Sequence, residues 1–547
     1  MRVPVGPAMT LLVWALASVS AAAGQQTPQP GAALSLGSID FPVTADDAAA
    51  RREFELGVLA LHSFWYEEAL EHFGRARALE PDFAMAYWGE AMAHDHPAWG
   101  EPSDTVAARR VLSQPGASAP ASDREKAYLS AVRVLYDTVG TIDERRKRMV
   151  DQLREVARRW PEDDEARLFA ALYEMSLEEW SSHDSSDVLR TTAELEEIRA
   201  RRPEHPGAAH YLIHAYDTPE FAERGLPAAL AYAAIAPSSS HALHMPSHIF
   251  FELGRWADGS ASNRDAWNAS VAWVERENRP LSDLDFHAIG WWIFSLAQQG
   301  RFEEALRRQA QLDSIVDRIW SEGPPEKQNV LIIPMLASMT RVTLARDAEA
   351  AGLHPALPLR TDPAVVAAVE ERAPDVAMFE RFVRARTARG EEARRVWNEL
   401  GPVLAAVPPG ARMPRHLGLL LEARVALADG DTAAALAVYD SAVARFEAHP
   451  QVLSQILSDL PREERASLLY ALGRNGAALA DWKAVLDYAP RRPTALLGAA
   501  RAAAAAGKRE QAAEYYRLLA EIWRAADEEL PALAEARAYL EGEDVNR

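Results

Sequence analysis

The chain has no cysteine in its 547 residues, and this absence alone excludes several classes of protein. Disulfide-stapled folds, thiolate zinc sites, iron–sulfur clusters and cysteine nucleophiles all need a thiol. Positive charge is also scarce, since 59 basic residues stand against 80 acidic ones and the formal net charge is −21. A surface this negative repels phosphate backbones, so we expect no nucleic-acid partner.

Long apolar runs are rare as well. The stretch from Met9 to Val19 has the length of a signal peptide and is too short to span a bilayer comfortably. Arg2 precedes it, and the small residues at 21–23 supply a cleavage site. No cysteine follows that site, so a lipid anchor cannot be attached there. We expect an exported protein, periplasmic or secreted, with no integral membrane span after cleavage; an uncleaved N-terminal anchor is the alternative.

A short pattern recurs along the rest of the chain: a glycine, an alanine five residues later, and a large residue four further on. Such a glycine ends one helix in a left-handed turn, and the small alanine lets the next helix pack closely. The large residue fills the groove between neighbouring helices. The clear copies are Gly430/Ala435/Tyr439, Gly473/Ala478/Trp482 and Gly507/Ala512/Tyr516, and the weaker ones are Gly300/Ala305/Gln309 and Gly254/Gly259/Asn263.

This pattern resembles the tetratricopeptide repeat (TPR), a helix–turn–helix unit of about 34 residues. Strand signals are nearly absent, and helical periodicity rich in alanine and leucine dominates. We therefore predict an all-α fold, a TPR-like α-solenoid forming the right-handed superhelix of such repeats. The predicted organisation is a signal peptide at 1–23, a disordered lead-in at 24–44, an N-terminal array at 45–310 that carries a histidine cluster, an irregular helical connector at 311–410 and C-terminal repeats at 411–547.

The histidines are concentrated in one part of the chain, since six of the fifteen fall between residues 205 and 248. Most of them are spaced by three or four residues, which places side chains on one face of a helix. First helices of consecutive repeats lie side by side along the concave wall, so we expect these faces to converge. The members are His210, His214 and Asp217 in one segment, His241, His244 and His248 in the next, and His287 in a third.

We expect this cluster to bind a divalent transition metal, either zinc, copper or iron. Neutral imidazoles with one carboxylate suit these ions, and a chain without thiolates has no stronger ligands. If the ion is catalytic, Asp217 and His244 are the candidates for moving protons. The competing interpretation is a polar, hydrogen-bonded seam between helices. The predicted metal ligands are His210, His214, His248, His244 and His287.

Pro246 leaves the second segment open to two arrangements. If this proline occupies the first position of a helix, His244 lies in the preceding loop. If it lies inside a helix, the helix kinks and a carbonyl near Ala242 is left free. His248 is helical in both arrangements, so we prefer it to His241 as a ligand.

A second group of histidines and aromatics is a candidate ligand groove beside the metal. His94 and His96 are two residues apart near the end of a predicted helix, where a loop would let them converge. Packing into the core is the competing interpretation for the aromatic members. The candidate groove residues are His94, His96, Trp99, Trp88 and Trp291.

Three segments resemble an exported bacterial branch of TPR proteins: residues 84–89 (AMAYWG), 210–217 (HYLIHAYD) and 241–248 (HALHMPSH). No established activity or metal attaches to that branch, so the resemblance implies a fold and a shared motif only. The chain departs from the branch at His287, where an aromatic-x-x-His-Asn pattern is expected and Ala288 replaces the asparagine.

Two functions are therefore compatible with the sequence. The first is a metal-binding protein, or a metal-dependent enzyme, with a small molecule or an extended peptide in the concave groove. The second is a scaffold that binds an extended peptide or a partner protein, with structural histidines. Common catalytic signatures such as His-Glu-x-x-His and Gly-x-Ser-x-Gly are absent from the sequence.

Overall fold

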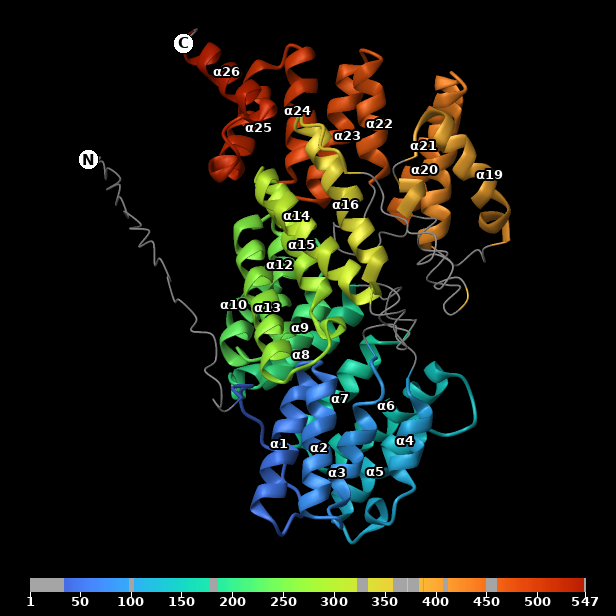
Figure 1. Cartoon of the computed structure of the whole chain (residues 1–547), viewed down its shortest axis with the longest axis vertical. Coiled ribbons are helices and arrows are strands. Elements are labelled where there is room, and N and C mark those ends of the chain that lie inside the picture. The colour runs from blue at the N-terminus through green and yellow to red at the C-terminus, as the bar shows by residue number, and fades with distance from the viewer. Residues whose placement is uncertain are drawn as a thin grey trace, which may run out of the picture. The chain divides into compact units, whose positions relative to one another are not determined.

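Helices are the regular secondary structure throughout the described part of the chain (Figure 1). The computed structural model describes residues 34–97, 103–177, 185–321, 333–357, 371, 383–386, 388–406, 412–448 and 460–545. The helices up to residue 252 are α1 (Ala48–His62), α2 (Tyr66–Leu79), α3 (Ala84–Met92), α4 (Thr105–Leu112), α5 (Asp123–Leu135), α6 (Ile142–Arg159), α7 (Asp164–Met175), α8 (Ser185–Arg201), α9 (Pro206–Tyr216), α10 (Ala222–Ile235), α11 (Ser240–His244) and α12 (Pro246–Glu252).

The later helices continue the same alternation of helix and short connection. Short 3₁₀ turns occur at Pro115–Ser118, Leu281–Asp283 and Trp523–Ala525. The helices are α13 (Trp256–Arg276), α14 (Phe286–Gln298), α15 (Phe302–Ser321), α16 (Ile333–Ala350), α19 (Gly390–Ala406), α20 (Arg412–Ala428), α21 (Thr432–Ala448), α22 (Pro461–Ala471), α23 (Asn475–Tyr488), α24 (Pro493–Ala505), α25 (Arg509–Ile522) and α26 (Pro531–Val545).

Helix–turn–helix pairs are the building unit, as α1 with α2, α20 with α21, α22 with α23 and α24 with α25 show most clearly. The predicted turn glycines adopt the left-handed conformation, with φ between 63° and 78°. In the three clear copies, the alanine five residues after the turn glycine is fully buried, at 0% exposure. The prediction of an all-α, TPR-like solenoid is therefore confirmed. The turn glycines are Gly254, Gly300, Gly430, Gly473 and Gly507.

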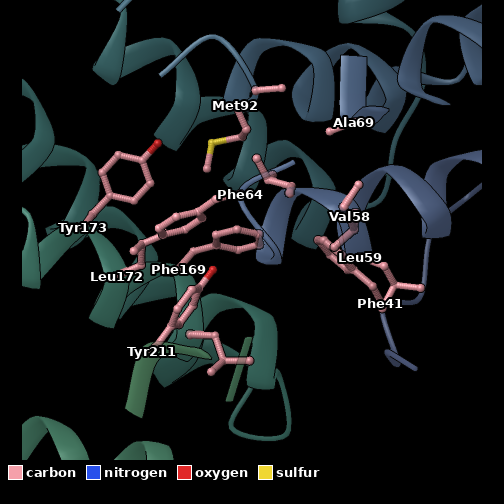
Figure 2. Close-up of a cluster of buried hydrophobic side chains, with 14 of the residues drawn as sticks. Phe41, Val58, Leu59, Phe64, Ala69, Met92, Phe169, Leu172, Tyr173 and Tyr211 are labelled. Atoms are coloured by element: carbon pink, nitrogen blue, oxygen red, sulfur yellow. The ribbon is translucent and has the colours of Figure 1, made fainter. Parts of the chain in front are cut away.

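The first helical pair makes the same turn without glycine. Ser63 caps α1, and Phe64 follows with a φ of 52°. A side chain in this left-handed region costs roughly 1–2 kcal/mol. The ring of Phe64 is only 4% exposed and belongs to the N-terminal core, which also contains Phe169 and Tyr211 (Figure 2).

The predicted lead-in is ordered where the structure describes it. Leu36 and Phe41 are 1% and 4% exposed in the N-terminal core, and the Ser38 amide donates to the Glu204 carbonyl. Apolar burial thus holds residues 34–44 in place without a helix or strand. The predicted signal peptide at 1–23 lies outside the described residues.

The predicted boundary at residue 310 falls within α15, which runs on to Ser321. Beyond it, α16 packs against both α14 and α15. Much of the predicted connector, including 322–332 and 358–370, lies outside the described residues. Within the part of the chain that is described, we find no helix with the length and apolar character required to cross a membrane.

Candidate metal centre

Three segments carry the histidines, and the local sequence defines where the helix of each segment begins. Pro206 occupies the first turn of α9, where its missing amide proton costs nothing. Ser239 caps α11 by accepting the amide of Ala242, and Asp285 caps α14 by accepting the amide of Ala288. The Ser240 hydroxyl also donates to Asp285, which ties the start of α11 to the start of α14.

Pro246 stands where the second segment passes from one short helix to the next. It is the first residue of α12, yet His244 lies in helix α11 and not in a loop. Met245 joins the two helices with helical angles, φ −53° and ψ −36°. His241 and His248 are therefore both helical, and the preference for His248 over His241 has no structural basis.

The first imidazole group joins α9 to α11. Nε2 of His210 lies 3.1 Å from Nε2 of His214 and 3.0 Å from Nε2 of His241. His210 is fully buried, whereas the other two imidazoles are partly accessible. His241 was not among the predicted ligands. Its helical spacing from His244 and His248 is the sequence signal that could have identified it.

The second imidazole group joins α11 and α12 to α14. Nε2 of His244 lies 3.1 Å from Nε2 of His248, and the His287 ring centroid lies 4.6 Å from that of His244. One ring nitrogen from each member falls within 4.8 Å of the others. By its ring nitrogen, His248 is grouped with His244 and His287, although its ring centroid is as near to that of His214 (6.3 Å) as to that of His287 (6.4 Å).

Oxygen atoms outside the two groups hold the far nitrogens of the buried imidazoles. Nδ1 of His210 donates to the His62 carbonyl at 2.7 Å, and Nδ1 of His244 donates to Oδ1 of Asn263 at 2.6 Å. The Asn263 amide nitrogen donates to the Gly259 carbonyl, which fixes its oxygen toward His244. Each Nδ1 thus carries the proton, and each Nε2 presents a lone pair to its group.

Asp217 performs the same task for His248. Its Oδ2 lies 2.7 Å from Nδ1 of His248, and a carboxylate only accepts. With both rings in the neutral form, the Nε2 atoms of His244 and His248 present two lone pairs to each other at 3.1 Å. A cation between the nitrogens would relieve this contact. Zinc–imidazole bonds of about 2.0–2.1 Å would place two such nitrogens about 3.3 Å apart.

Burial keeps these imidazoles neutral. It lowers the pKa of His214 to about 4 and that of His287 to about 3, with the neighbouring His248 as a further cause for both. Neutral imidazole is the form that binds metal. Burial is also the first cause of a lowered pKa at the remaining members for which a shift is found, which are His210, His241 and His244.

Two carboxyl groups accompany the second imidazole group. Asp217 positions His248 and lies near Glu252, whose pKa is raised well above its ordinary value by burial and by the Asp217 charge. Glu252 is 7% exposed, and its Oε2 has no hydrogen-bond partner within the described residues. Asp217 accepts from His248 and His244 donates to Asn263, so both groups are hydrogen-bonded here, and their role in moving protons stays a prediction.

Aromatic rings form the walls of the site. Phe64 stacks on His241 and His214, with ring centroids 5.4 Å and 5.5 Å away. Trp291 lies 4.4 Å from the ring of His248 and 4.9 Å from that of His244. Trp291 is therefore a candidate groove residue that contacts the second imidazole group directly.

For His96 and Trp88, the ring contacts that the structure shows are made within the N-terminal core. His96 stacks on Tyr66 at 3.9 Å, and Tyr66 stacks on Phe64, so two aromatic layers separate His96 from the first group. Trp88 is fully buried in the N-terminal core, and His94 is partly buried with a pKa lowered by burial. Trp99 lies outside the described residues.

A further buried cluster, which the sequence analysis did not identify, lies behind His210. Glu165 accepts from Nε2 of His62 at 2.7 Å and from Nε2 of His205 at 3.0 Å, and the Tyr211 hydroxyl lies 2.8 Å from Nδ1 of His62. The Tyr211 hydroxyl donates to Nδ1 of His62, so the lone pair of that nitrogen is already engaged in a hydrogen bond. No sequence spacing links these residues, because 103 positions separate His62 from Glu165. We interpret this cluster as a hydrogen-bonded support.

Comparison with known proteins finds structural likenesses at low sequence identity. No protein-family model matches it, and no curated protein sequence does. Similar solved structures include a human IFIT1 dimer with m7Gppp-AAAA (12% identity, 89% of this chain and 92% of that chain, TM-score 0.36), yeast Tom70 (11%, 91% and 97%, 0.32) and the P58(IPK) TPR domain (12%, 91% and 99%, 0.19). Likenesses of this size carry no argument about what the chain binds.

Proposed function

We propose that this protein binds a transition metal through the imidazoles of α9, α11, α12 and α14. The observation that carries the proposal is the 3.1 Å contact between Nε2 of His244 and Nε2 of His248, whose Nδ1 atoms both face an oxygen acceptor. A polar seam between helices would pair a donor with an acceptor at this position. A metal ion accepts both lone pairs at once.

The ligand type narrows the choice of ion. Imidazole nitrogen suits zinc, copper and ferrous iron, whereas magnesium and calcium take oxygen. Carboxylates lie behind the imidazoles, with Asp217 orienting His248. A bound ion of this class polarises a substrate or activates water, and with neutral ligands it keeps its full positive charge for that purpose.

The proposal includes an exported location. The apolar stretch from Met9 to Val19, the small residues at 21–23 and the absence of cysteine support it. Amino-terminal sequencing of the protein from its native host, with a start at Gly24, would support export. A mature protein that retains Met1 and remains in the cytoplasm would contradict it.

Elemental analysis of the purified full chain tests the proposed metal binding. The variant H210A/H244A removes the buried imidazole of each group, and we expect it to bind no stoichiometric metal while retaining helical circular dichroism. A matched control, H72A/H354A, removes two imidazoles elsewhere and should keep the metal. A wild-type chain that holds no ion after incubation with zinc or copper, and whose unfolding neither ion affects, would leave the helical array as a peptide- or protein-binding scaffold.

A further inference from the structure

The histidines repeat a single arrangement twice along the helices. In each case two imidazoles four residues apart on one histidine segment meet a third imidazole from the next such segment. His210 and His214 on α9 meet His241 on α11. His244 and His248 meet His287 on α14. We propose that the site holds two transition-metal ions, one in each group of three imidazoles; this inference rests on the proposed metal-binding function.

The arrangement follows from the register of the α11–α12 segment. His241 is three residues before His244 and seven before His248, so all three lie on one face of this helical segment. Along this face, His241 contacts His210 of α9, and His244 contacts His287 of α14. One helical segment thus contributes to both groups, which is why the two groups are neighbours.

The same spacing of positions shows that the pattern of imidazole groups stops before α9 and after α14. On α9, the position three before His210 is Gly207, which has no side chain to offer to an earlier group. On α14, the positions three and seven after His287 are Gly290 and Phe294, which cannot bind a metal. The chain therefore supplies ligands for two groups and not for a longer series.

One ion cannot use all six imidazoles. A transition metal with bonds of about 2.0–2.1 Å takes four imidazoles in a tetrahedral shell. The ring nitrogens divide into two groups of three, with the members of each within 4.8 Å of one another. Ring centroids do not make this division, since His214 and His248 lie 6.3 Å apart across the groups and His248 and His287 lie 6.4 Å apart within one; the division depends on where the ring nitrogens lie. Three imidazoles leave each ion an open position for water or a substrate atom.

The second group has a negative charge beside it. Imidazole ligands add no negative charge, so compensation for a bound cation must come from nearby groups. Asp217 lies behind His248 and supplies a carboxylate there. Each group also has two partly accessible imidazoles, so ions can reach both.

Metal stoichiometry decides between one and two ions. We would titrate the metal-free full chain with Zn²⁺ and measure bound zinc by equilibrium dialysis. The variant H210A/H214A leaves a single imidazole in the first group, and H244A/H248A does the same in the second. Because buried histidines can matter for folding, the milder variants H214A and H287A each remove one partly accessible imidazole. Exposed His354 supplies the control variant H354A.

We expect two zinc ions per wild-type chain and one in each double variant. Cu²⁺ loading adds a second readout, since two neighbouring ions give a broadened or silent electron paramagnetic resonance signal and a single ion gives an isolated one. One ion in the wild type, lost in both double variants, would overturn the two-ion inference and leave the proposed function standing. No bound ion in the wild type would overturn both.

Discussion

Phe64 occupies the same position in the connection between α1 and α2 as Gly254 occupies in the connection between α12 and α13. Each is the residue after a helix cap, and each has a left-handed φ, 52° and 63°. Glycine adopts this conformation freely, whereas phenylalanine pays roughly 1–2 kcal/mol. Strain of this kind persists at functional sites. Here it places an aromatic ring against His241 and His214.

An alanine variant is usually more stable than a glycine variant, and we expect substitution at Phe64 to reverse this order of stability. Both F64A and F64G lose about 3–5 kcal/mol of stability, because a buried ring is removed. We expect F64G to be more stable than F64A by about 1 kcal/mol, since glycine relieves the left-handed strain. Urea unfolding of the two variants measures the difference. An F64A protein as stable as F64G would show that no strain is stored there.

Removal of the Asp217 carboxylate should weaken one imidazole group selectively. In D217A, His248 loses the acceptor that holds its Nδ1 proton, and we expect zinc to bind the second group about 10–100-fold more weakly. Competition with a chromophoric chelator gives the affinity. The matched control is D258A, because Asp258 pairs with Arg255 on an exposed surface. Equal weakening in both variants would refute a positioning role for Asp217.

The metal-free protein should lose stability on acidification below pH 6.5. The folded state lowers the pKa of His214 to about 4 and of His287 to about 3, so between these values and about 6.5 the unfolded chain binds more protons. Each such imidazole contributes a slope of about 1.4 kcal/mol per pH unit in that window, and stability rises with pH. Chemical unfolding at pH 7, 6 and 5 measures it. We expect the double variant H214A/H287A to show a shallower slope than wild type, and an unchanged slope would exclude these two groups as its source.

Neutralisation of Glu165 should destabilise the fold and leave the metal bound. In E165Q the amide replaces one acceptor with a donor, so a hydrogen bond to His62 or His205 is lost in a fully buried place, at a cost of about 3–5 kcal/mol. Thermal unfolding and elemental analysis on the same preparation separate the two effects. Loss of one equivalent of zinc from folded E165Q would instead identify the cluster as a metal site.

The helical repeats were predictable because their determinants are local. A glycine such as Gly473 ends a helix through its own left-handed conformation, and Ala478 five residues later permits close packing. The histidine faces were predictable for the same reason, since helix pitch alone places His210 and His214 together. The order of residues 34–44 was not predictable, because it depends on burial of Leu36 and Phe41 against helices far along the chain.

The all-α architecture and the concentration of imidazoles on three helical segments follow from the order of the residues alone. Helix pitch and turn conformation depend on residues within about four positions of each other, so spacing records them. Three relationships follow instead from helix packing: His241 joins the α9 pair, a ring nitrogen of His248 lies near one of His287, and the His62 carbonyl, 148 positions away, orients His210. These relationships depend on how separate helices pack, and packing is set by side-chain contacts that no sequence spacing encodes.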